Sequence, residues 1–476
     1  MILLVLAIAV HVAFCLSLYY HFFNPLFYIT SHSKGQGGPF FGIYQAGVNL
    51  QNGESIYANQ NYRAPTEVTV PYYHFYRYLP FPSYISAVMT KVLRPWPAYW
   101  TWIFINELLL TACLLLTLRL RNRFGPAVIA VSAFWLLYSP MYIELFMGQF
   151  CFTMSFFIFL ILYPYLKQEP ENAYRTNPLP TGGTTASARV HGAPDNRDIN
   201  QSEPSEATLS PEDLHPASMQ RHAENLPSVP AKNLTWIPAV SWIFSVLLKS
   251  FTALYALTLI RIGKKRLVIT GIVVAILTSA PYFLRHPQDL RWFVHLNFHP
   301  LPPTLTGGCL GFVGLLRDVS NRFLTFLNVE RIQIGFFDIA PRNIPLIVVI
   351  GSIILFSLAI TIRKKRIDPV CNIALWTLTF FLVFKDIWEY HYVMLIPLFV
   401  VFYLQTRSKY VLILFILMAV PTPFIFYDVP MSNDPQVHWS APLSLIHHSF
   451  KAIPTFLFYV WVVRREFRNV TETQAA

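Results

Sequence analysis

Residues 236–284 read WIPAVSWIFSVLLKSFTALYALTLIRIGKKRLVITGIVVAILTSAPYFL. Two apolar runs fill this stretch, and a basic cluster at Lys264-Lys265-Arg266 separates them. A single cation, Lys249, interrupts the first run. Apolar runs of about 20 residues are typical of helices that cross a lipid bilayer. The stretch therefore predicts membrane-spanning helices joined by a basic turn.

The composition of the whole chain indicates the same class. Of its 476 residues, 54% are hydrophobic and 13% are charged, whereas about 25% are charged in an average soluble domain. A formal net charge of +12 would raise the question of nucleic acid in a soluble protein, but here the basic residues stand in short clusters between apolar runs. We therefore predict an all-α polytopic membrane protein with no nucleic-acid partner. The five cysteines lack metal-site spacing, so we expect no metal and no cofactor.

Five basic clusters predict the topology. Lys and Arg concentrate on the cytoplasmic side of membrane proteins, so an even number of crossings should separate consecutive clusters. The clusters lie at 119–123, 264–266, 363–366, 407–409 and 464–468. About twelve spans satisfy this rule with both termini in the cytoplasm, and we expect them near 2–22, 98–118, 126–146, 150–166, 236–248, 251–260, 267–284, 343–362, 369–384, 392–405, 410–427 and 449–463.

Lys249 divides one apolar run into two of these spans. A single tilted helix over 236–260 is the alternative interpretation. Two short helices that meet at Lys249 on the outer side keep the number of crossings even, because irregular backbone is tolerated in a membrane protein where it lines a cavity.

The same rule places two large loops outside the membrane, at 24–97 and 285–342. Within the first loop, the aromatic stretch 73–93 contains Arg77 and Lys91. A full crossing there would reverse the side of the next basic cluster. We therefore expect 73–93 to lie as a helix in the outer interface.

The chain is expected to contain two membrane regions, 1–167 and 235–476. The residues between them, 168–234, are rich in Pro, Ser, Thr and acidic side chains and poor in aromatic ones. Such a segment buries too little apolar area to offset the entropy of ordering it. It is predicted to be a disordered cytoplasmic insertion.

Polar side chains near the outer ends of the spans are the candidates for a functional site. Ionisable groups at a membrane are costly, so they are functional candidates by default. Lys249 has no acid within four residues. We interpret it as a phosphate-binding cation, with a lysine that only extends to the interface as the alternative. Further candidates are Arg77, Glu144, Gln149, Glu389 and His391.

Several motifs, taken in order, resemble a known family. They are Gly42-Ile43-Tyr44-Gln45-Ala46-Gly47, Gly53-Glu54-Ser55-Ile56-Tyr57, Tyr76-Arg77-Tyr78-Leu79-Pro80, Gly148-Gln149, Leu248-Lys249-Ser250, Gly314-Leu315-Leu316-Arg317 and Trp388-Glu389-Tyr390-His391. Their order and spacing resemble glycosyltransferase family 87 of the GT-C superfamily, over most of the chain except 168–234. Members of that family are integral membrane alpha-mannosyltransferases that use a polyprenyl-phosphate mannose donor.

The resemblance implies an activity at the outer face of the cell membrane. A hexose, mannose in the family, would move from a polyprenyl-phosphate sugar to a hydroxyl of a lipid or glycan acceptor, with inversion at the anomeric carbon. By this resemblance Lys249 and Arg317 would hold the donor phosphate, and His391 would belong to the catalytic group. Substrate contacts are further expected from Tyr44, Gln45, Arg77, Tyr78 and Gln149.

One position departs from the family pattern. The presumed catalytic base of the family is an aspartate before the aromatic pair of the first motif, and here that position is Pro39. Proline cannot accept a proton. We expect Glu389 to act as the base instead, with Glu144 as the second choice.

Two other functions stay open at this stage. One is a non-catalytic relative of the family, because Pro39 replaces the usual aspartate. The other is a transporter or flippase for lipid-linked sugars. Transport is disfavoured because the polar groups gather at one membrane face, whereas charges at the midplane and inverted repeats would be expected of a transporter.

Overall fold

The computed structural model describes residues 2–27, 35–57, 67–71, 73–167, 236–298, 310–323, 332–334, 337–339, 343–363, 367–422 and 441–475. The insertion expected to be disordered, 168–234, lies outside the described residues. All of the described residues fall within one compact unit.

Helices form most of the described chain, and several of them begin at a proline. Pro95, Pro140 and Pro369 each open a helix, because an amide hydrogen is not needed in the first turn. The α-helices are α1 (Ile2–Tyr20), α2 (Gly38–Gln51), α3 (Phe81–Thr90), α4 (Pro95–Leu118), α5 (Arg121–Phe124), α6 (Ala127–Leu137), α7 (Pro140–Met147), α8 (Cys151–Lys167), α10 (Trp236–Leu248), α11 (Tyr255–Arg261), α12 (Lys265–Arg285), α13 (Pro287–Phe298), α14 (Phe312–Phe323), α15 (Ile344–Arg363), α16 (Pro369–Val383), α17 (Ile396–Thr406), α18 (Lys409–Ala419) and α20 (Ala441–Ala475). The 3₁₀ helices are η1 (Asn24–Leu26), η5 (Ser250–Leu254) and η8 (Glu389–Leu395).

Four of the described helices, α1, α4, α12 and α15, are long and apolar enough to cross a membrane. A fifth candidate is the pair α6 and α7, which bends by 46° between them. The all-helical membrane class is therefore supported, and the count of twelve spans stays a prediction. Shorter apolar helices make up part of the expected remainder, among them α8, α10, α16 and α18.

Large apolar side chains point outward from the candidate spans. Leu277 on α12 and Leu355 on α15 are 67% and 66% exposed. Extended apolar surfaces of this kind are unfavourable in water and indicate a lipid environment. The buried core lies on the other side of the helices and is strongly aromatic. Phe134, for example, stacks on Phe415 with ring centroids 3.9 Å apart.

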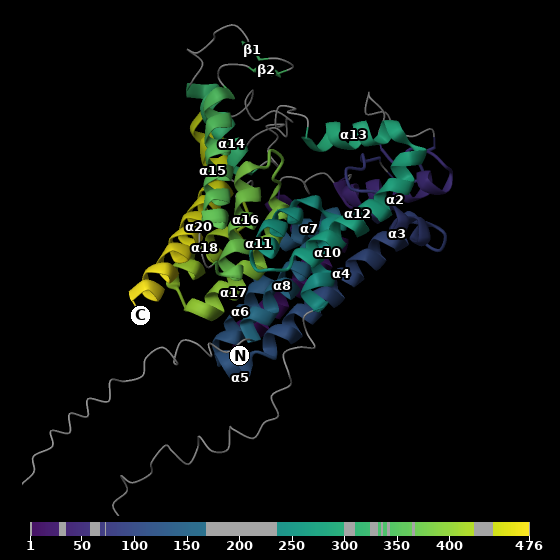
Figure 1. Ribbon diagram of the computed structural model, residues 1–476. Helices are drawn as coiled ribbons and strands as arrows, with labels where there is room; N and C mark the ends of the chain where they lie inside the picture. Colours follow the sequence, from purple (N-terminus) through teal and green to yellow (C-terminus); the bar gives the residue numbers. More distant parts are fainter. Residues whose placement is uncertain are drawn as a thin grey trace, which may run out of the picture. The chain divides into compact units, whose positions relative to one another are not determined.

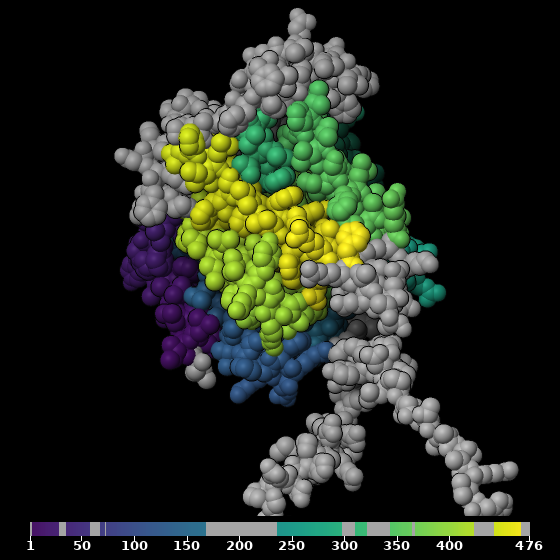
Figure 2. All heavy atoms as spheres, turned by 90° about the vertical axis from the view of Figure 1, so that its left-hand side faces the viewer, coloured from purple at the N-terminus to yellow at the C-terminus, as the bar shows by residue number. Residues whose placement is uncertain are grey.

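The C-terminal helices pack along one another through the same kind of contact. The rings of Phe399 on α17 and Phe458 on α20 stack at 4.7 Å, and Phe402 meets Trp461 at 5.1 Å. Figure 2 shows α20 lying over the light-green helices on this face of the molecule.

Hydrogen bonds join chain segments beside four of the five basic clusters. Arg407 donates to the carbonyl of Phe124 at 2.5 Å, and Arg465 donates to Gln405 Oε1 at 3.2 Å. The amide of Asp368, just after the third cluster, donates to Glu466 Oε1 at 3.4 Å. These clusters therefore lie at one end of the helices, as the charge rule requires. The side of the membrane on which that end lies stays a prediction.

The opposite end carries the segments expected outside the membrane. Figure 1 shows α5 at the lower end of the bundle and α13 with the strands β1 (Ile332–Ile334) and β2 (Phe337–Ile339) at the upper end. The two strands pair antiparallel, with Gln333 opposite Asp338, and form a small addition to the otherwise helical fold. The helix expected over 73–93 is shorter in the structure, because α3 begins only after Pro80.

Candidate active site

Lys249 lies where two helices meet. Helix α10 ends at Leu248, and Lys249 has extended backbone angles of φ −143° and ψ 112° before η5 begins. The chain is therefore broken at the lysine instead of running through it as one helix. The Lys249 side chain is partly exposed. Its Nζ atom lies 2.9 Å from the sulfur of Cys151 and 6.0 Å from the centroid of the Tyr390 ring.

The carboxylate of Glu144, on α7, faces the Lys249 region. Gly148 ends this helix with φ +64°, and a Cβ atom there would lie 2.7 Å from the Cβ of Phe40. Only glycine fits this turn, which folds α8 back so that the amide of Phe152 donates to Glu144 Oε1 at 2.9 Å. An acid is favoured beside the free amides of a helix N-terminus. Glu144 is 1% exposed.

Glu144 and Lys249 are coupled through Cys151. The thiol of Cys151 lies beside the Glu144 carboxylate, and Lys249 is within electrostatic range of that carboxylate. The other carboxylate oxygen of Glu144, Oε2, has no hydrogen-bond partner among the described residues. The carboxylate therefore keeps one acceptor atom that the described part of the chain does not use.

Tyr78 and Arg77 reach this site from the segment before α3. The hydroxyl of Tyr78 donates to Gln149 Oε1 at 2.6 Å, and burial raises the pKa of Tyr78 to about 12, so it stays a donor at neutral pH. Arg77 lies at the rim: its side chain is 40% exposed and its Nη1 atom is 3.6 Å from Asp386 Oδ2.

His391 completes the group from η8. Its Nδ1 atom accepts from the amide of Trp388 at 2.9 Å, and its ring lies 4.4 Å from that of Tyr390. Burial, with the nearby charge of Lys249 as a second cause, lowers the pKa of His391 well below its usual range. The ring is therefore neutral, and the bond to Nδ1 leaves the proton on Nε2, which is then a donor.

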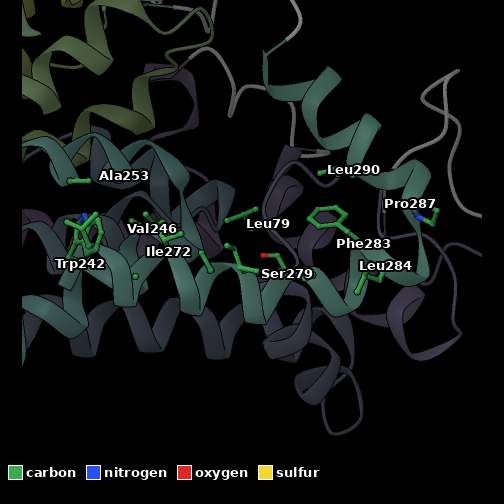
Figure 3. A pocket seen from close by; sticks show the side chains of 16 residues that line it. Leu79, Trp242, Val246, Ala253, Ile272, Ser279, Phe283, Leu284, Pro287 and Leu290 are labelled. Carbon is green, nitrogen blue, oxygen red and sulfur yellow. The ribbon is translucent and has the colours of Figure 1, made fainter. Parts of the chain in front are cut away.

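An apolar groove of about 820 Å³ lies between α10, α12 and the start of α13. Figure 3 shows Trp242, Ile272 and Phe283 among the side chains that line it. The lining also includes Val246 and Ala253, which flank Lys249 in the chain, and Leu79, which follows Tyr78. The groove therefore extends along segments that also supply the polar site.

Glu389 belongs to a different group, although it is only two residues from His391. Its Oε1 atom accepts from the amide of Thr422 at 3.2 Å and lies 3.9 Å from Lys451 Nζ. Both side chains of this ion pair are almost completely buried. Among the described residues, neither this hydrogen bond nor this ion pair of Glu389 involves Lys249.

The remaining predicted residues lie elsewhere. Arg317 is on α14, which packs against α20. Tyr44 donates to the carbonyl of Leu93 at 2.7 Å. Gln45 is completely buried and holds Asn49, Glu67 and Thr69 through its side-chain amide. Gln45 therefore orders part of the loop that follows α2, and Tyr44 ties α2 to the turn before α4.

Pro39 lies in the first turn of α2, which abuts the end of α7. The amide of Gly37, just before α2, donates to the carbonyl of Phe146 at 2.7 Å. Phe146 follows Glu144 by two residues on α7. The position that carries aspartate in the resembled family is therefore close in the fold to the helix that carries Glu144.

Sequence reasoning missed two members of the site. Cys151 has no metal-site spacing in the sequence, and its contact with Lys249 joins residues 98 positions apart. Tyr390 belongs to the Trp388-Glu389-Tyr390-His391 motif, from which no role is predicted for the tyrosine. Its place between a histidine and an acid in a polar run at a span end was the available signal.

Comparisons of the chain with protein-family models, with curated proteins and with solved structures give no match.

Proposed function

We propose that this protein is a GT-C-like membrane glycosyltransferase that moves a hexose, mannose by resemblance, from a polyprenyl-phosphate sugar to a hydroxyl of a lipid or glycan at the extracytoplasmic face. The observation that supports it best is a polar site around Lys249 together with an apolar groove lined by the same chain segments. A polyprenyl-phosphate sugar has the same two parts, an anionic head and a long apolar chain.

The donor phosphate is assigned to Lys249, His391 and Arg77. Lys249 offers an ammonium group whose hydrogen bond within the described chain goes to a thiol, and charge-assisted bonds to phosphate are stronger than that contact. His391 offers Nε2–H without adding charge. Arg77 at the rim adds a second cation. Together they stabilise the negative charge that appears on the phosphate as it leaves.

The general base is assigned to Glu144 in preference to Glu389. The acceptor oxygen attacks the anomeric carbon, the bond from that carbon to the phosphate oxygen breaks, and the phosphate departs with the electron pair. The acceptor proton passes to the carboxylate. Glu144 is coupled to Lys249 through Cys151, whereas Glu389 is paired with Lys451. Glu144 thus takes the role that the resembled family gives to the aspartate at the position of Pro39.

The polyprenyl chain is assigned to the groove. Its described lining is apolar apart from Ser279, and it lies on α12, one of the helices long enough to span a membrane. A donor could enter it sideways from the lipid without exposing its chain to water.

Turnover by the full-length protein in lipid nanodiscs tests the proposal. Polyprenyl-phosphate mannose is supplied, and released polyprenyl phosphate and mannosylated acceptor are both measured. Glu144→Gln should reduce turnover by about 10²–10⁴-fold and leave donor binding within about twofold. Glu67→Gln is the matched control, because that side chain is exposed and, within the described part of the chain, Glu67 bonds Gln45 through its backbone carbonyl.

Three results would contradict the proposal or part of it. Unchanged turnover in Glu144→Gln places the base elsewhere. Donor binding without turnover in the unmodified protein, with some turnover restored by Pro39→Asp, favours the non-catalytic relative. Movement of intact donor between leaflets without sugar release favours the flippase.

A further inference from the structure

We propose that His11, Cys15 and Glu107 form an intramembrane site for a zinc-like divalent transition metal. The three side chains come from two of the helices long enough to cross a membrane, α1 and α4. They lie near the middle of those helices, and the proposed glycosyl transfer does not involve them. Ionisable groups at this depth are costly and are functional candidates for that reason.

The geometry brings three good ligand atoms together. His11 and Cys15 are four residues apart on α1 and therefore share one helix face. His11 Nε2 lies 2.9 Å from Glu107 Oε2, and Cys15 Sγ lies 3.7 Å from Glu107 Oε1. All three ligand atoms fall within 4.8 Å of one another.

These separations are close to those of a tetrahedral zinc centre. Zinc bonds of about 2.0–2.3 Å place neighbouring ligand atoms roughly 3.3–3.6 Å apart. The observed distances of 2.9 and 3.7 Å, each to a different oxygen of Glu107, lie on either side of that range. With all three ligand atoms within 4.8 Å of one another, shifts of up to about 1 Å would accommodate the ion. His11 Nδ1 has no hydrogen-bond partner among the described residues, so turning Nε2 toward a metal costs the ring only its bond to Glu107.

The charge balance favours a divalent ion. Zinc binding displaces the proton of the Cys15 thiol, and the bound thiolate and the Glu107 carboxylate then carry two negative charges. His11 binds as the neutral imidazole. The site with Zn²⁺ is therefore neutral overall, which suits an environment of low dielectric constant. Nitrogen, sulfur and oxygen ligands together favour zinc over magnesium or calcium.

The three ligands leave a fourth position. Glu107 has a side-chain exposure of 27%, whereas that of His11 is 8%. The open position therefore lies on the more exposed, Glu107 side of the site. Three protein ligands with one open position is the arrangement of zinc sites that bind a further molecule.

Cobalt substitution tests the site in the purified full-length protein. Titration with Co²⁺ should produce a thiolate-to-metal absorption band, and Zn²⁺ should remove it by competition. Cys15→Ser should abolish the band, and Glu107→Gln should weaken Co²⁺ binding by more than the about 10–100-fold typical of outer-shell changes. Cys113→Ala, another free cysteine of the same helix pair, should keep the band.

Size-exclusion profiles establish that each variant is folded before it is titrated. As a second measure, Zn²⁺ should raise the thermal unfolding temperature of the unmodified protein and of Cys113→Ala, and have no such effect on Glu107→Gln. The proposal is overturned if the unmodified protein shows no thiolate band with Co²⁺. It is equally overturned if the band survives in Cys15→Ser, because the metal then binds elsewhere.

Discussion

Two lysines, Lys249 and Lys451, stand in apolar stretches of this protein, and their surroundings differ. Lys451 is completely buried on α20, where it lies 3.9 Å from Glu389 and donates to the carbonyls of Met418 and Val420 at 2.7 and 2.5 Å. Those carbonyls end α18, where a cation is favoured. Lys249 is partly exposed, and the hydrogen bond that the structure gives its ammonium group goes to a thiol.

The difference separates a structural cation from a candidate binding cation. Lys451 has its charge and its donors satisfied by the protein, so nothing is left for a ligand. Lys249 keeps donor capacity, and Val246 and Ala253, near it in the chain, line the apolar groove. A lone charge in an apolar sequence run is therefore not enough to identify a site, and its partners decide which role it has.

Replacing Lys451 should have the largest effect on stability. Lys451→Met leaves Glu389 buried without its counter-ion, and loss of one partner of such a pair costs about 3–5 kcal/mol. Denaturant unfolding in detergent measures this cost. The double variant Glu389→Gln/Lys451→Met should recover most of it. The comparison fails if Lys249→Met destabilises the protein as much as Lys451→Met does, because the buried Glu144 keeps the Phe152 amide as a partner when Lys249 is replaced.

Gly148→Ala should have the second-largest effect on stability. The disturbance should be confined to the region around Lys249. The φ of +64° at Gly148 costs about 1–2 kcal/mol for any other residue, and the 2.7 Å approach to Phe40 adds about 1–3 kcal/mol of overpacking. Gly53→Ala is the matched control, because Gly53 has φ +72° with nothing within 4 Å. Thermal unfolding of the two variants separates the clash from the backbone term. Equal losses would mean that α2 and α7 do not pack as described.

Lys249→Met should weaken binding of polyprenyl phosphate without unfolding the protein. A charge-assisted hydrogen bond contributes about 1.5–3 kcal/mol, so affinity should fall about 10- to 150-fold. Binding to the protein in nanodiscs is the measurement. The Glu389→Gln/Lys451→Met double variant also lacks a lysine and should bind normally, and weakened binding there would remove the distinction between the two lysines.

Arg77→Gln should have the smallest effect. Its ion pair with Asp386 is long and partly exposed, and such pairs contribute about 0–1 kcal/mol to stability. Donor binding should fall severalfold at low salt, and the difference from the unmodified protein should shrink as salt screens the exposed charge. A salt-independent loss would place Arg77 inside the site instead of at its rim.

The sequence alone determined the class of the protein and the location of its isolated cation. Composition and the length of apolar runs are properties of local segments, so they can be read without knowledge of the fold. The helix break at Lys249 and the turn at Gly148-Gln149 can be predicted from the sequence for the same reason. The resemblance in motif order added a function to be tested.

Only the tertiary structure decided which acid accompanies the cation. Glu389 and His391 are two residues apart, but η8 is a 3₁₀ helix with three residues per turn. Their side chains therefore leave the axis in different directions, and Glu389 meets Lys451 while His391 lies toward Lys249. Glu144 reaches Lys249 through Cys151, a contact across 98 residues. Pairings of this kind depend on how helices pack, and neither spacing nor hydropathy along the chain encodes them.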